Sequence, residues 1–309
     1  MATVHFSDIT ARGTLALFNE SMEQAPQVWR KHCQVIPSDA KDEKHVWMGM
    51  FPVPREFTSG RNLQGVRDFS FTLTNKVYEL SFVFDRDTYA DDRHGQIKQR
   101  LKEISEVWAR FHDSLFAALL TAGETSTDTF DGISFHNGTR TIGASANIDN
   151  TGTAAITLNT DPSTSDVLDA LQTITTHMAR YEDDQAQAGY NTQAMQKLAV
   201  IIPPEFKRAF TEAINSTVIS QSDNPWGNQL VDFDVLPHLA TSDVAFYTSA
   251  LGSVRKPFIY QDREPLEINV YNGGNDIALN NGLLVLCRQR FVFGYGEPRR
   301  SYRWDYTTA

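Results

Sequence analysis

Two groups of acidic residues in this sequence have types and spacing that could support chemistry. Asp91-Asp92-Arg93-His94 combines carboxylates with an imidazole, and both kinds of group bind metal ions. Adjacent aspartates ahead of a helical pattern are more often capping groups, so we expect no metal here. Asp223, Asp232 and Asp234 could supply paired carboxylates for acid–base catalysis. Asp232 and Asp234 alternate with apolar residues, and we favour two solvent-facing aspartates on a strand.

The sequence carries none of the motifs that mark common catalytic or cofactor sites. Its eight histidines form no H-E-x-x-H pattern, and no serine lies in a G-x-S-x-G turn. Gly273-Gly274 and Gly294-Tyr295-Gly296 lack the spacing of a phosphate-binding loop and are typical of turns. Cys33 and Cys287 are far apart and lack zinc-ligand spacing, so we expect free, buried thiols in a reducing compartment. We therefore predict a protein that is not an enzyme and that holds no cofactor and no metal.

Arginines are interleaved with aromatic residues near the C-terminus. In single-stranded nucleic-acid sites, arginines contact the backbone while aromatic rings stack on the bases. The same residue types are enriched where protein subunits meet, and we favour that interpretation. The residues concerned are Arg288, Arg290, Arg299, Arg300, Arg303, Tyr295, Tyr302, Trp304 and Tyr306.

A similar group surrounds a break between two strand-like segments. Residues 45–51 form a short apolar run, and apolar residues recur at every second position over 69–84, which favours β-strands. Pro52, Pro54 and Gly60 interrupt them. A projecting hairpin of this kind cannot bury its apolar residues alone, so we predict that it contacts another subunit. The predicted assembly-interface residues are Trp47, Phe51, Arg55, Phe57, Arg61 and Arg67.

The strongest helical pattern in the chain covers residues 96–122. Apolar residues recur there at steps of three and four and form one stripe along the predicted helix. Such a helix is on the order of 40 Å long, which is unusual for a globular domain. Gly123 follows the pattern and is a plausible stop. The predicted core residues of this helix are Leu101, Ile104, Trp108, Phe111 and Leu115.

The remaining segments alternate between helical and strand patterns. Residues 124–165 are rich in Thr, Ser, Gly and Asn and favour loop or weak β-structure. Asp161-Pro162 predicts the start of a second amphipathic helix that extends to Tyr181. Further strands are expected at 198–202, 231–235, 258–260, 267–271 and 283–293, with a third helix after Pro203-Pro204. The predicted fold class is α+β.

Composition narrows the function further. The chain has 309 residues, of which 41% are hydrophobic and 21% charged, so it can bury a substantial core. Its 38 acidic and 28 basic side chains give a formal net charge of −10, which argues against a protein whose main role is to grip nucleic acid. No apolar run approaches the length of a membrane-spanning helix, and Met1–Thr10 does not resemble a secretory signal.

The order of several short motifs resembles the Mu-like prophage major head subunit family. The match begins with Trp47–Pro52, continues through Asn75-Lys76-x-Tyr78-Glu79 and Leu198–Pro204, and ends with Lys256–Arg263 and Gly294-Tyr295-Gly296. It covers roughly residues 20–300, and its specificity lies in the order and spacing of the motifs together. The segment 137–165 departs from the expected pattern and is interpreted as an insertion or a divergent loop.

The resemblance implies a Hong Kong 97-type capsid fold. The expected divisions are an N-terminal arm at 1–40, an extended loop at 41–86, a peripheral domain at 87–194 with its spine helix at 96–122, an axial domain at 195–255, and strands at 256–309 that complete the peripheral domain. It also implies a major capsid protein whose copies form hexamers and pentamers of an icosahedral head around double-stranded DNA, without sequence-specific contacts to it.

The implied partners are other copies of the chain, together with scaffold, portal and decoration proteins, and no membrane. The expected location is the virion capsid, assembled in the cytoplasm of the host bacterium. Two alternatives stay open at this point: a cellular nanocompartment shell of the same fold, and a soluble hydrolase with an unrecognised carboxylate site. Neighbouring genes would distinguish a nanocompartment shell from a phage capsid protein. The size of the protein in solution would distinguish a hydrolase, which would be a small oligomer, from either shell protein.

Overall fold

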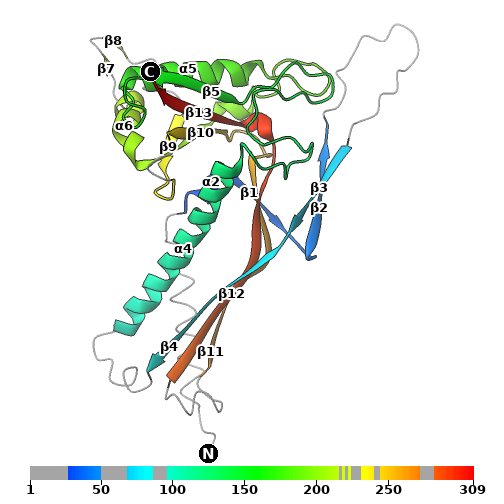
Figure 1. The fold of residues 1–309 in the computed structure, drawn as a ribbon. Helices are drawn as coiled ribbons and strands as arrows, with labels where there is room; N and C mark the ends of the chain where they lie inside the picture. The colour runs from blue at the N-terminus through cyan, green and yellow to red at the C-terminus, as the bar shows by residue number, and fades with distance from the viewer. Residues whose placement is uncertain are drawn as a thin grey trace, which may run out of the picture.

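A long four-stranded sheet and a single long helix form the elongated lower part of the protein (Figure 1). The computed structural model describes residues 27–49, 68–85, 96–215, 218–219, 222–223, 231–239, 244–271 and 282–309. The strand order is β1 (Cys33–Pro37), β11 (Phe258–Tyr271), β12 (Gly282–Tyr295) and β4 (Lys76–Asp85). β1 runs parallel to β11, and the other neighbours are antiparallel. Alternate residues of β12 are buried, which is the period-two pattern of a sheet covered on one face.

The helix α4 (Gln96–Ala122) covers that face of the sheet and confirms the predicted helix at 96–122. Phe116, Ala117 and Leu120 share a buried cluster with aromatic residues of β11 and β12. Trp108 is also buried, and its Nε1 donates a hydrogen bond to Gln289 Oε1 at 2.8 Å. The helix ends where the backbone N–H of Gly123 bonds to the carbonyl of Leu120 at 3.1 Å, as the glycine predicts.

The buried face of α4 is rotated relative to the stripe predicted from apolar periodicity. Ile104, Phe111 and Leu115 are only partly buried, whereas Trp108 is buried and the side chain of Leu101 lies outside the described set. The fully buried line instead contains Ser105, Ala109, His112, Phe116 and Leu120. Polar residues fit on this line because their groups find partners: His112 Nδ1 lies 2.9 Å from the Trp108 carbonyl, and its ring stacks on Phe291. The spacing of apolar residues alone does not identify such polar residues as part of the core.

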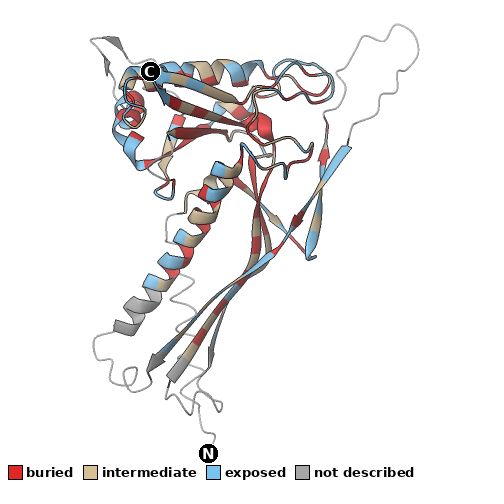
Figure 2. Cartoon of the chain, viewed as in Figure 1, coloured by how far each residue is buried: buried red, intermediate tan, exposed pale blue. Residues whose placement is uncertain are grey.

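A five-stranded sheet forms the upper part of the protein. Its order is β5 (Thr151–Ile156), β13 (Ser301–Thr308), β10 (Ala245–Ala250), β6 (Leu198–Ile202) and β9 (Val231–Val235). The helices α5 (Thr164–Arg180) and α6 (Lys207–Asn215) pack over it, and all residues of β6 and β10 are buried (Figure 2). Shorter elements are α2 (Trp29–His32), η1 (Ala194–Gln196), η2 (Pro204–Phe206), β7 (Val218–Ile219), β8 (Ser222–Asp223) and η3 (Pro298–Arg300).

The two sheets do not follow the predicted domain ranges. β5 and α5 lie within the predicted peripheral range 87–194, and β13 lies within 256–309, yet all three belong to the upper layer with β6, β9 and β10. β4 lies within the predicted extended loop 41–86 but pairs with β12 in the lower sheet. The physical reason is that strands distant in sequence complete each sheet, so contiguous ranges cannot describe either one.

The second helix begins two residues later than predicted. Its N-cap is Ser163, not Asp161. The Ser163 side chain accepts from the Asp166 N–H, and the Asp166 carboxylate accepts from the Ser163 N–H at 2.9 Å. This reciprocal capping box satisfies two backbone donors at the helix start. Asp161 instead pairs with Arg208 on α6 at 3.2 Å.

The Ser-, Thr- and Gly-rich stretch after α4 is an irregular segment organised around one buried arginine. Arg140 is fully buried, and its Nε lies 2.9 Å from the Asp131 carboxylate. Its remaining N–H groups donate to the carbonyls of Ile133, Ser134 and Phe135 at 2.7 to 3.0 Å. A guanidinium can satisfy several carbonyls at once because its donors are fixed in a plane, so this segment is ordered without regular secondary structure.

We predict that truncating Phe116 destabilises the subunit more than truncating its neighbour Leu115. Phe116→Ala removes a fully buried ring and should cost about 3 to 5 kcal/mol, whereas Leu115→Ala, at a partly buried position, should cost about 1 to 2 kcal/mol. Denaturant unfolding of the two soluble variants measures the difference. Equal losses would show that the helix buries a different face.

We also predict that both cysteines remain thiols. Cys33 and Cys287 are free and buried, and burial raises the pKa of Cys33 and raises that of Cys287 to about 11. Because the thiolate is the reactive form, alkylation near pH 8 should be about a hundred-fold slower in the folded than in the unfolded protein. Denaturing gels without reductant should show only the monomer, and a reductant-sensitive ladder would contradict the prediction.

Candidate assembly interface

A two-stranded hairpin stands apart from both sheets at the side of the molecule (Figure 1). It consists of β2 (Asp42–Met48) and β3 (Asp68–Thr74), which pair antiparallel from Asp42↔Thr74 to Met48↔Asp68. Its outer face, which includes Lys44, Val46 and Thr72, is exposed. The chain between its strands, residues 50–67, lies outside the described residues.

The inner face of the hairpin rests on the lower sheet. Leu73 packs directly over Gly294, where an added Cβ atom would lie only 2.6 Å from Leu73 Cδ1 and would force the leucine side chain to shift. The side chain of His45 contacts Gln261, with Nε2 2.6 Å from Oε1. Gln261 in turn donates to Asn75 Oδ1 at 2.8 Å. These contacts connect the inner end of the hairpin to β11 and β12.

The outer end of the hairpin is held by Trp47. The indole ring stacks on Phe130 with their centroids 4.5 Å apart and their planes 2° from parallel. Its Nε1 donates to Glu297 Oε2 at 2.9 Å. Trp47 is 7% exposed and thus buried within its own chain. The prediction that it serves a neighbouring subunit is therefore replaced by a role inside the subunit, because its ring and its N–H both have intrachain partners.

Glu297 is the centre of what we call the Glu297 cluster, which comprises Glu297, Arg299, Trp47 and Tyr190. Arg299 donates to Glu297 from Nε at 2.7 Å and from Nη2 at 3.1 Å, a bidentate geometry. The Tyr190 hydroxyl donates to the same oxygen as Trp47, at 3.0 Å. The Arg299 guanidinium also lies over the Tyr190 ring at 3.7 Å. Both carboxylate oxygens of Glu297 thereby have partners, and Arg299 Nη1 donates to the Glu182 carbonyl at 3.3 Å.

The electrostatics of the Glu297 cluster favour the charged state of both partners. Burial alone raises the pKa of Glu297, but the charge of Arg299 and the hydrogen bonds from Arg299, Trp47 and Tyr190 outweigh burial and lower the pKa to about 2. Burial alone lowers the pKa of Arg299, and the charge of Glu297 raises it above its ordinary value. The contribution of Glu297 to stability is complete above the carboxyl pKa of the unfolded chain and is lost as pH falls towards 2.

The other predicted interface residues cannot be placed. Phe51, Arg55, Phe57, Arg61 and Arg67 all lie outside the described residues, as do Asp91-Asp92-Arg93-His94 and Gly273-Gly274. Within the described ranges, no cluster of three or more His, Cys, Asp or Glu side chains could hold a metal ion. None of the described helices is long and apolar enough to cross a membrane.

The C-terminal arginines and aromatics belong to the fold of the subunit itself. Tyr295, Tyr302, Trp304 and Tyr306 are buried, so both the interface and the base-stacking interpretations are wrong for these rings. Arg288 and Arg290 both pair with Glu264, at 2.6 and 2.8 Å. Arg303 pairs with Asp305 at 2.8 Å and also with Glu124. The pattern of arginines and aromatics thus reflects strands whose inner faces are core and whose outer faces carry ion pairs.

The strand aspartates are also used internally. Lys31 Nζ lies 2.5 Å from Asp232 and 2.7 Å from Asp234, and the buried His32 lies 3.1 Å from Asp234. Burial raises the pKa of Asp234, but its bonds to His32 and Lys31 outweigh burial and lower it. A carboxylate held in this ionised state by a lysine stabilises the fold and is poorly suited to proton transfer near neutral pH. The lysine ties α2 to β9.

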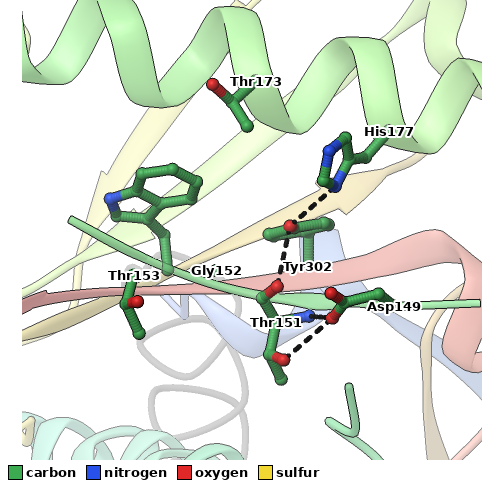
Figure 3. Close-up of a pocket in the computed structure, with 8 residues that line it drawn as sticks. Asp149, Thr151, Gly152, Thr153, Thr173, His177 and Tyr302 are labelled. Atoms are coloured by element: carbon green, nitrogen blue, oxygen red, sulfur yellow. Dashed lines mark hydrogen bonds between the residues drawn. The ribbon is translucent and has the colours of Figure 1, made fainter. Parts of the chain in front are cut away.

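One cavity of about 350 Å³ lies between α5 and the edge strand β5 (Figure 3). His177 Nδ1 is 3.1 Å from the Tyr302 hydroxyl, which itself donates to the Thr151 carbonyl at 2.8 Å. Because Tyr302 has one proton, His177 must be the donor in their contact. Asp149 accepts from the N–H and hydroxyl of Thr151. These groups are engaged with backbone and with each other, and the cavity contains no nucleophile paired with a base.

Sequence reasoning missed Glu297 and Tyr190, and it assigned Arg299 to a subunit interface. The available local signal was Glu297-Pro298-Arg299, in which the glutamate caps the short helix η3 and accepts from the Arg299 N–H. An acidic residue ahead of a proline at a helix start is a recognised capping pattern. Nothing in the local sequence connects it to Trp47, which is 250 residues away.

Known proteins with similar structures include phage capsid proteins. The chain resembles the capsid of cyanophage P-SCSP1u with a TM-score of 0.61 and 11% identity, covering 92% of this chain and 89% of that chain. It resembles the procapsid of bacteriophage JBD30 with a TM-score of 0.57 and 18% identity, covering 99% of this chain and 77% of that chain. At these identities the likeness shows the fold alone, a mixed α+β fold of phage capsid proteins.

Sequence comparison identifies the relatives. Over 142 residues the chain is 28% identical to the major capsid protein of Escherichia phage Mu, and the alignment covers 46% of this chain and 46% of the Mu protein. The matched region therefore spans less than half of that relative. Residues 9–175, more than half of the 309, match the family described as the Mu-like prophage major head subunit gpT. The chain therefore belongs to the Mu-like prophage major head subunit family.

Proposed function

We propose that the chain is a major capsid protein that assembles into hexamers and pentamers of an icosahedral phage head enclosing double-stranded DNA. The observation that carries this proposal is the family match over residues 9–175, which is joined by a fold shared with phage capsid proteins. In this proposal the lower sheet with α4 is the peripheral domain with its spine helix, and the five-stranded sheet is the axial domain near the capsomer centre.

The proposed mechanism is mutual burial between copies. Residues 50–67 carry Phe51, Phe57 and three arginines and follow directly from an anchored hairpin. The arginines would meet carboxylates of a neighbour, and Phe57 would fill an apolar patch there. Of the predicted arm 1–40, residues 29–37 form α2 and β1 within the subunit, so the part that would reach another copy is the segment before α2. Many weak contacts of this kind become strong together, because each one is made in a closed symmetric array.

The proposed partners follow from this role. They are other copies of the chain, a scaffold, a portal, decoration proteins, and packaged DNA held without sequence-specific contacts. The net charge of −10 supports a shell that does not adhere to the packaged polymer. Assembly would take place in the cytoplasm of the host bacterium.

The direct test is to purify the protein, alone and with its scaffold, and to examine it by sedimentation and negative-stain microscopy. Capsomers, shells, tubes or irregular polymers are expected. A sharp monomer peak at every protein and salt concentration would contradict the proposal.

A second experiment tests the role of the loop. Replacing residues 53–67 by a short Gly-Ser linker should leave circular dichroism and melting nearly unchanged but abolish closed shells. Normal shells from this variant would refute the role of the loop, and loss of folding would place the loop in the core.

A milder change should weaken assembly in a salt-dependent way. Arg61→Glu reverses one charge of the loop, and each exposed ion pair contributes at most about 1 kcal/mol. Because the contact recurs around the whole shell, the protein concentration needed for assembly should rise, and the rise should depend on ionic strength. Arg61→Lys keeps the charge and serves as the control. Identical assembly curves for wild type and Arg61→Glu at all salt concentrations would show that Arg61 makes no such contact.

A further inference from the structure

The hairpin β2–β3 is supported at two separate places along its length. The inner support consists of Leu73 on Gly294 and the contact of His45 with Gln261, both against the lower sheet. The outer support is the contact of Trp47 with Glu297, which belongs to the segment before β13. Trp47 pairs with Phe69, so along the strands the outer support lies about 7 Å from His45 and about 13 Å from Leu73.

Two supports on different segments fix the direction of the hairpin relative to the body of the subunit. With only one support, the hairpin could rotate about that contact. The outer support is placed where the chain leaves the hairpin for residues 50–67. Gly49 adds to it, because its Cα lies against the carboxylate of Asp184 in the 182–191 segment and an added Cβ would displace that side chain.

The acceptor in the outer support is itself held rigidly. The carboxylate of Glu297 is clamped by the bidentate bond from Arg299, and the Arg299 carbonyl accepts from Asn191 Nδ2 at 2.6 Å. Arg299 Nη1 also donates to the Glu182 carbonyl at 3.3 Å. Since a buried pair of this kind cannot lose a partner cheaply, the carboxylate cannot rotate to follow a moving indole.

We propose that Glu297 is a positioning residue for assembly, which sets the direction of the hairpin β2–β3 through the Trp47 N–H. This inference rests on the proposed function, and it adds that the direction of the hairpin is built into the free subunit before any neighbour is met. Arg299 fixes the acceptor, Trp47 transmits its position, and Phe130 holds the indole plane.

Two hydrogen bonds to the same oxygen provide a matched pair of variants. Trp47→Phe keeps a ring against Phe130 and removes the donor on the hairpin. Tyr190→Phe keeps the ring beneath Arg299 and removes a donor of similar length on the body. If Glu297 positions the hairpin, amide exchange over residues 42–48 of the unassembled subunit should accelerate about ten- to a hundred-fold in Trp47→Phe. It should change less than about two-fold in Tyr190→Phe.

The shells provide the second readout. Trp47→Phe should give a broad distribution of particle diameters or open sheets, and Tyr190→Phe should give particles of wild-type diameter. Uniform wild-type particles from both variants would overturn the inference. So would equal broadening in both, because the cluster would then contribute stability and not direction. Neither result would affect the proposed function, which fails only if the wild-type protein forms no shells.

A measurement without a variant covers the case in which Trp47→Phe does not fold. In the wild-type unassembled subunit, amide protection should be as high at the Trp47↔Phe69 pair as at the Glu43↔Leu73 pair, which has the same place in the alternating hydrogen-bond pattern. An unsupported hairpin frays progressively towards its outer end. Protection that falls steeply from Leu73 towards Phe69 would therefore overturn the inference.

Discussion

The buried ion pair between Glu297 and Arg299 is the interaction on which the arrangement of this subunit depends. Two charges removed from water cost several kcal/mol unless every donor and acceptor is paired. The pair meets that condition only because three segments converge on it: the hairpin through Trp47, the 182–191 segment through Tyr190, and η3 itself. An arrangement that separated these segments would remove the Trp47 and Tyr190 donors from a buried carboxylate, so the pair ties the hairpin to the body of the subunit.

A second constraint is the match between α4 and the lower sheet. Both are long, and their contact is made by aromatic rings that interlock, including Phe116 with Phe258 and His112 with Phe291. Rings packed edge to face or stacked at such distances tolerate little sliding. In the proposed shell the same contacts would repeat many times, and this stiffness would limit the small errors that accumulate around a ring.

The fold persists at identities of 11 and 18% to phage capsid proteins, where few side chains are shared. Cores tolerate extensive substitution when volume and hydrophobic pattern are kept, so two proteins can share a fold although few of their residues are identical. The specific polar contacts are more easily lost, since each needs two matched partners. For this reason the likeness supports the architecture, while the family assignment comes from the matching sequence over 9–175.

Much of the secondary structure was determined by local sequence. The helix at 96–122, the strands at 198–202 and 231–235, and the class α+β all follow from periodicity and from glycine and proline positions, because each element must present one apolar face. The buried thiols were also foreseeable. Local sequence did not identify which face of a helix is buried or where a helix begins. The buried face of α4 includes the polar residues Ser105 and His112, and α5 begins after the N-cap Ser163.

Only the tertiary structure decided which segments share a sheet and what each polar side chain meets. β5 and β13 lie beside each other although their residues are far apart in the chain, which no contiguous domain range could anticipate. Trp47 was expected to face a neighbour because an apolar ring on a projecting hairpin has no local partner. Its partners, Phe130 and Glu297, come from distant segments. Local sequence specifies which surfaces must be covered, but the covering partner is selected by packing and hydrogen bonding over the whole chain.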